Sequence, residues 1–72
     1  MDFVLRNGPH IIRLVQVCYD LGSPKTEKRE VDALLECAGE LTCDNLLIVT
    51  SAEQRTIEKN GYRIDVVPIS MF

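Results

Sequence analysis

Residues 10–21, HIIRLVQVCYDL, form the longest strand candidate in the chain. Alternation places two sets of side chains on opposite faces of this run: Ile12, Leu14, Gln16, Cys18 and Asp20 on one, and Ile11, Arg13, Val15, Val17 and Tyr19 on the other. Both faces are mostly apolar through the middle, which is typical of a central strand covered on both sides. The run therefore predicts a strand inside a sheet.

A hairpin and a helix are predicted on either side of this strand. The short extended run 2–6 precedes Asn7 and Gly8, a pair that favours a tight turn because such turns need positive φ. After the strand, Ser23 suits a helix N-cap and Pro24 suits the first helical position. An apolar stripe at helical spacing follows, formed by Val31, Leu34, Leu35, Ala38 and Leu41.

The remaining runs complete a mixed α/β sheet. Residues 45–50, NLLIVT, predict a buried strand parallel to the first one, because a helix separates the two. Residues 55–58 and 62–69 flank a second turn signal at 59–61. The predicted order is hairpin, helix, parallel strand and hairpin. One helix covers one sheet face only, so we expect a partner copy or another part of a longer protein to cover the second face.

Length, charge and cysteine content limit the class of protein. The chain has 72 residues, enough for a single domain over 1–72, and its net charge of −3 does not favour nucleic acid as a partner. Three cysteines (Cys18, Cys37 and Cys43) and one histidine (His10) lack the spacing of a disulfide framework or a zinc site. No apolar run suggests a membrane span or a signal peptide, so we expect a cytoplasmic protein without a membrane partner.

The chain resembles a known group of proteins over nearly its whole length. The segments DFVLRNG, LVQVCYDL, ALLECAGEL, NLLIVT and YRIDVVPI, in this order and spacing, look like the C-terminal domain of prokaryotic P-loop ATPases of the AAA type. That domain has no assigned activity of its own. The resemblance implies that the chain is the C-terminal part of a longer ATPase. ATP and Mg²⁺ are expected only in the N-terminal part of that parent protein, because this chain has no G-x-x-x-x-G-K-[ST] motif.

The same domain is more distantly similar to the restriction-endonuclease-like fold of PD-(D/E)xK nucleases. In those enzymes two carboxylates on adjacent strands hold Mg²⁺ and a lysine stabilises charge. The resemblance places Asp2 at the first acid, Gln16 at the second acid and Cys18 at the lysine. An amide brings no negative charge and a thiol no positive charge, so the resemblance implies a degenerate site without catalytic or metal-binding residues. Asp20 is a candidate for a displaced acid that would pair with Asp2.

Three functional hypotheses follow. The first is a non-catalytic scaffold, regulatory or partner-binding domain, which contacts the rest of the parent ATPase or a second copy through the apolar sheet face. The second is a divergent Mg²⁺-dependent nuclease module acting on DNA through Asp2 and Asp20. The third is a small free-standing protein that dimerises.

Overall fold

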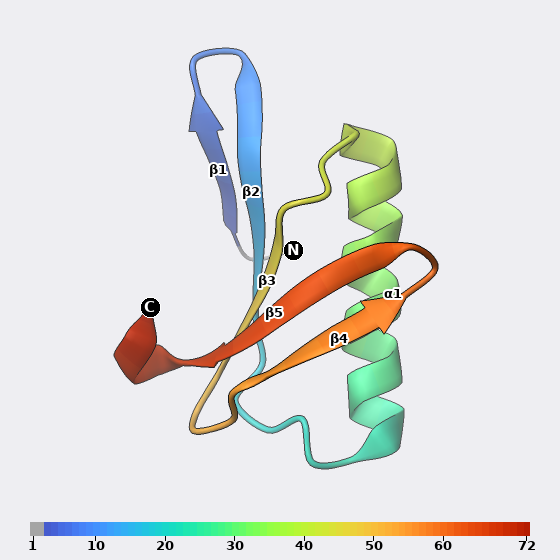
Figure 1. Ribbon diagram of the computed structural model, residues 1–72, viewed down its shortest axis with the longest axis vertical. Coiled ribbons are helices and arrows are strands. Elements are labelled where there is room, and N and C mark those ends of the chain that lie inside the picture. Colours follow the sequence, from blue (N-terminus) through green and yellow to red (C-terminus); the bar gives the residue numbers. More distant parts are fainter. Residues whose placement is uncertain (1–2) are drawn as a thin grey trace.

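The computed structural model describes residues 3–72, which form one sheet and one long helix (Figure 1). The elements along the chain are β1 (Phe3–Asn7), β2 (His10–Val17), α1 (Pro24–Leu41), β3 (Leu46–Thr50), β4 (Arg55–Lys59), β5 (Tyr62–Pro68) and the 3₁₀ turn η1 (Ile69–Met71). The five strands lie in the order β1-β2-β3-β5-β4. The central three are parallel, and β1 and β4 pair antiparallel at the two ends. The predicted α/β class and order of elements are confirmed.

The first long strand is shorter and less regular than its sequence pattern predicts. β2 ends at Val17, so Cys18, Tyr19 and Asp20 lie beyond it. A β-bulge interrupts its pairing with β1, because Leu5 pairs with Arg13 whereas Arg6 pairs with Ile11.

The bulge inserts one extra residue and reverses the alternation on its N-terminal side. Ile11 therefore packs against the helix-side core and Ile12 is 49% exposed. The prediction that Ile12 shares a face with Leu14 is wrong for this reason.

Both predicted hairpins form, with different turn geometry. At the second turn Asn60 and Gly61 both have positive φ, the pattern of a type I′ turn. At the first turn the loop residues are Gly8 and Pro9, and only the glycine has positive φ. A glycine at the first central position is typical of a type II′ turn.

The helix begins and ends close to the predicted positions. Ser23 is the N-cap, although its side chain makes no capping hydrogen bond, and Pro24 is the first helical residue. The apolar stripe is buried at Val31, Leu34, Leu35 and Ala38. The helix ends at Leu41. The C-cap Thr42 adopts the left-handed conformation with φ 52° and donates its N–H to the Ala38 carbonyl. Only the last stripe residue, Leu41, is partly exposed.

Two apolar clusters lie on opposite faces of the sheet. The helix-side cluster joins the α1 stripe to buried residues of the sheet and loops: Leu14, Leu21, Cys43, Leu46, Ile48, Ile64 and Val66. The cluster on the other face comprises Val15, Leu47 and Val49, with Val17 and Val67 packed against it. The molecule measures 35 × 26 × 17 Å. We call the surface around Val15, Leu47 and Val49 the helix-free face.

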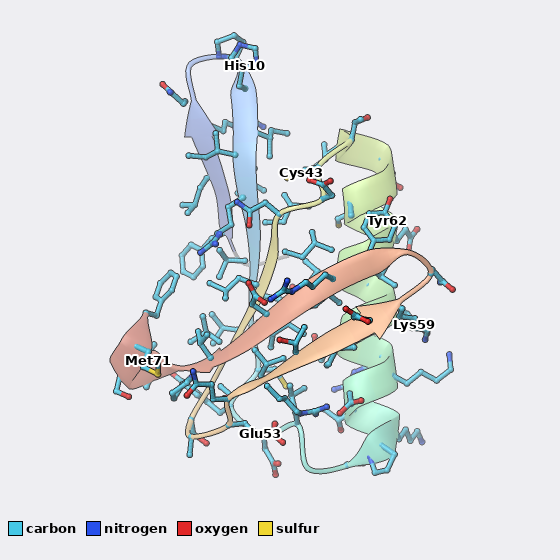
Figure 2. All side chains as sticks on the ribbon, viewed as in Figure 1. His10, Cys43, Glu53, Lys59, Tyr62 and Met71 are labelled. Atoms are coloured by element: carbon cyan, nitrogen blue, oxygen red, sulfur yellow. The ribbon has the colours of Figure 1, made fainter. Side chains whose placement is uncertain are left out.

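Ion pairs join α1 to the far edge of the sheet. The Arg55 guanidinium of β4 pairs with the Glu27 carboxylate of α1, and the Lys59 ammonium lies 2.8 Å from the Asp32 carboxylate. In Figure 2 the Lys59 side chain lies beside the helix. Arg55 and Lys59 occupy alternate positions of β4 and so point to the same side of the sheet. The β4 edge is thereby attached to the helix at two points.

Candidate functional site

The position that the nuclease resemblance gives to the second acid, Gln16, faces α1. Its Nε2 donates a hydrogen bond of 2.6 Å to Oε2 of Glu30. Its Oε1 is buried and accepts no hydrogen bond among residues 3–72. The carboxylate fixes this orientation, because a turned amide would place two acceptor oxygens against each other. The side chain is thus occupied in joining β2 to the helix.

Glu30 is the residue that completes this site, and the sequence pattern missed it. Glu30 lies in a run of charged residues, which is typical of a solvated helix face, yet its side chain is only 17% exposed. Its position next to Val31, on the border of the apolar stripe, is the signal that points to partial burial. The Arg29 guanidinium lies 3.6 Å from the other carboxylate oxygen. The largely buried Glu30 carboxylate thus contacts the Gln16 amide through one oxygen and the Arg29 guanidinium through the other.

Cys18, which the nuclease resemblance places at the position of the lysine, carries a neutral thiol. It lies one residue beyond β2, and its Sγ is 3.5 Å from the Asp20 carbonyl oxygen. Burial raises the pKa of the Cys18 thiol, and the neighbouring Glu30 carboxylate raises it further. The thiol therefore stays protonated near neutral pH and supplies neither a positive charge nor a reactive thiolate.

The candidate displaced acid, Asp20, does not share a strand face with Gln16 and Cys18. It is exposed in the loop after β2, and its Oδ1 accepts the Gly22 N–H at 2.8 Å. Such a bond is typical of an Asx turn, in which the carboxylate stabilises its own loop. The predicted partner, Asp2, lies outside the described residues.

The carboxyl ends of the parallel strands are the usual place for a ligand in an open α/β sheet. A hollow of about 240 Å³ lies there between the loop 19–22 and the loop 51–53. Two of its polar groups bond within the loops, since the Ser51 hydroxyl donates to the Tyr19 carbonyl at 2.9 Å and Asp20 accepts the Gly22 N–H. Glu53 also lines the hollow, and its Oε2 is buried and has no hydrogen-bond partner among residues 3–72.

The donor set around Gln16 does not fit the Mg²⁺ ion of a nuclease. Magnesium prefers several oxygen ligands, yet Gln16 turns an N–H group toward Glu30. Within the described part of the chain, no three His, Cys, Asp or Glu side chains lie close enough to hold a metal ion. We therefore derive no metal-dependent step at this site.

The helix-free face is the second candidate site, and it suits binding rather than catalysis. Val15 and Val49 are fully buried among their neighbours on this face, and Leu47 is 3% exposed. A shallow depression of about 410 Å³ extends over the face between Leu47, Thr56 and Val67. Among residues 3–72, α1 is the only long helix and packs on the opposite side. The core of a parallel sheet is normally covered on both faces.

Large apolar side chains are exposed around this sheet. On β1, Phe3 and Leu5 pair with Val15 and Arg13, so they extend the helix-free face, and they are 51% and 40% exposed. At the end of the chain, Ile69, Met71 and Phe72 are also exposed. Met71 lies at the side of the molecule away from α1 (Figure 2). Apolar side chains gathered in this way are typical of a surface that contacts another polypeptide.

Comparisons with known proteins identify no relative. In the described range no helix is long and apolar enough to cross a membrane. No protein-family model, no curated protein and no solved structure matches this chain.

Proposed function

We propose that this chain is a non-catalytic accessory domain that binds another polypeptide through its helix-free face. One observation carries the proposal: the parallel strands β2, β3 and β5 bury an apolar cluster on the face that α1 does not cover. The cluster itself is already buried, so a partner segment would cover the more exposed apolar side chains at its margin, Phe3, Leu5 and Val67. Burial of apolar surface contributes about 25 cal/mol per Å². The segment patterns described above favour the C-terminal position in a larger ATP-binding protein of the AAA type.

The geometry around Gln16 supports a non-catalytic role. A nuclease needs a second carboxylate and a cation where this chain has an amide bonded to Glu30 and a protonated thiol at Cys18. Both groups join the end of β2 to α1 and the following loop. They therefore support the sheet that presents the helix-free face.

The partner is tested with the polypeptide encoded upstream of Met1 in the same reading frame. We expect that polypeptide to contain a G-x-x-x-x-G-K-[ST] loop and, when produced separately, to bind this chain in a calorimetric titration. Val67→Lys, on the half-buried rim of the helix-free face, should weaken binding at least tenfold. Glu36→Lys, on the exposed surface of α1, is the matched control and should leave binding unchanged. Equal affinity for both variants would contradict the assignment of this face.

A cleavage assay separates the proposal from a nuclease. We expect no Mg²⁺-dependent cleavage of double- or single-stranded DNA by this chain. If robust cleavage is found, and Asp2→Ala or Asp20→Asn abolishes it, the non-catalytic role is refuted.

Self-association is measured by sedimentation equilibrium of the isolated chain. A tight homodimer that is lost in Val67→Lys would show that the helix-free face binds a second copy instead of a partner chain.

A further inference from the structure

The two edges of the sheet differ in how they are protected. Each edge strand presents a row of backbone N–H and C=O groups, and natural proteins shield such rows with charged side chains. β4, with the sequence RTIEK, has three charged residues in five, two of which also pair with α1. β1, with the sequence FVLRN, has one charged residue, Arg6, and two half-exposed apolar residues, Phe3 and Leu5. The β1 edge is thus the open one.

We propose that the outer edge of β1 accepts an extended strand of a partner polypeptide that carries acidic side chains. This inference rests on the proposed partner-binding function, and it specifies the edge and the backbone pairing through which the partner binds. Within residues 3–72, β2 is the one strand that pairs with β1. An added strand would satisfy the backbone groups on the outer side of β1 by the same ladder of hydrogen bonds.

The side chains of β1 favour a strand over other forms of partner. Phe3 and Leu5 lie on the helix-free face beside Val15, whereas Val4 points to the helix side and packs against the core there. The pairing with β2 is regular from Phe3 to Leu5, so this part of the edge is extended and regular. Apolar side chains at alternate positions of an added strand would cover Phe3 and Leu5 and widen the apolar surface.

Charge selects an acidic partner strand over a second copy of the chain. The β1–β2 hairpin, residues 3–17, contains Arg6 and Arg13 and no acidic residue, so its formal charge is +2. The whole chain is −3, and the residues outside the hairpin therefore sum to −5. Two copies joined edge to edge would bring two positive hairpins together, and like charges on neighbouring strands are destabilising. A strand with carboxylates would be attracted instead.

The test uses two synthetic peptides, acetyl-TVEVEVT-amide and acetyl-TVKVKVT-amide, titrated into the whole chain and followed by NMR. We expect the glutamate peptide to shift the amide resonances of Phe3–Asn7 and to slow their hydrogen exchange. The lysine peptide should bind at least about tenfold more weakly, because it would place ammonium groups near Arg6.

Two charge reversals test the role of the hairpin. Arg6→Glu should weaken binding of the glutamate peptide about fivefold, while Arg63→Glu, at an exposed site on β5, should change it less than twofold. NMR dispersion of each free variant checks that it is folded, and Arg6→Gln replaces Arg6→Glu if the latter does not fold.

Three outcomes would overturn the inference. These are equal binding of both peptides, resonance shifts that map to β4, and self-association of the wild type through β1. If neither peptide binds but the upstream polypeptide still binds in a manner sensitive to Val67→Lys, the edge proposal fails and the proposed function stands. Loss of both kinds of binding would refute the proposed function as well.

Discussion

Replacing Gln16 with the acid found in nucleases is expected to destabilise this domain strongly. In Gln16→Glu a second carboxylate would lie against Glu30, whose side chain is only 17% exposed. At a separation of about 4 Å and an effective dielectric constant of about 20, two carboxylates repel by about 4 kcal/mol. Protonating one glutamic acid at pH 7 costs about 3.7 kcal/mol, because pH 7 lies about 2.7 units above its ordinary pKa. The expected loss of unfolding free energy at pH 7 is therefore about 3 to 4 kcal/mol.

The pH dependence of this loss has a defined sign. Repulsion raises the folded-state pKa of the carboxyl pair above the unfolded value of about 4.3. A group with a raised acid pKa destabilises the fold as pH rises above the unfolded pKa, and its penalty disappears below that value. Urea denaturation followed by far-UV circular dichroism should therefore show the full loss at pH 7 and a difference of less than about 1 kcal/mol near pH 4.

The control for this prediction is the exchanged pair, Gln16→Glu with Glu30→Gln. It restores one amide and one carboxylate, so its unfolding free energy should return to within about 1 kcal/mol of the wild type. If Gln16→Glu alone is as stable as the wild type at pH 7, the contact between Gln16 and Glu30 does not form in solution. A selective stabilisation of that variant by Mg²⁺ would show that its two carboxylates together bind the ion.

Three further variants test local features of the fold. Thr42→Gly should raise the unfolding free energy by about 1 kcal/mol in thermal or urea unfolding, because Thr42 is held at φ 52° where a side chain is strained. An unchanged unfolding free energy would contradict the left-handed conformation of Thr42. Thr50→Val should lower it by about 1 to 3 kcal/mol, because the buried hydroxyl bonds to three backbone groups. Thr56→Val on the exposed side of β4 is the control and should stay within about 0.5 kcal/mol. In Glu30→Gln the pKa of Cys18 should fall, because the carboxylate that raises it is removed. Iodoacetamide at pH 8 should therefore alkylate this thiol faster than in the wild type. An unchanged alkylation rate would contradict the influence of Glu30 on the thiol.

The helix and hairpins were predictable because short-range patterns determine them. The stripe from Val31 to Ala38 repeats at helical spacing and is buried as expected. Asn60 and Gly61 adopt the positive φ that their types favour. The apolar cluster on the face opposite the helix was also predictable, since the strand at 10–17 and the strand at 46–50 are apolar on both sides.

The details of the candidate site depend on contacts distant in sequence. The bulge beside Ile12 comes from the register between two strands, and alternation within a single strand does not reveal it. The burial of Glu30 depends on where α1 crosses β2, so its charged neighbours in the sequence suggest a solvated side chain. In the sequence Gln16 is an isolated polar residue of an apolar strand. Its hydrogen-bond partner, the Glu30 carboxylate, lies on the helix, and only the fold places its Oε2 2.6 Å from the Gln16 Nε2.

The charged β4 edge limits the size of any assembly that this domain enters. Strand-by-strand polymerisation continues only when each newly added chain leaves another edge available for the next one. Here Arg55 and Lys59 hold one edge against the helix, so addition at β1 uses the open edge and ends the series. The expected product is a complex of fixed stoichiometry, and we expect no fibrous growth from the folded state.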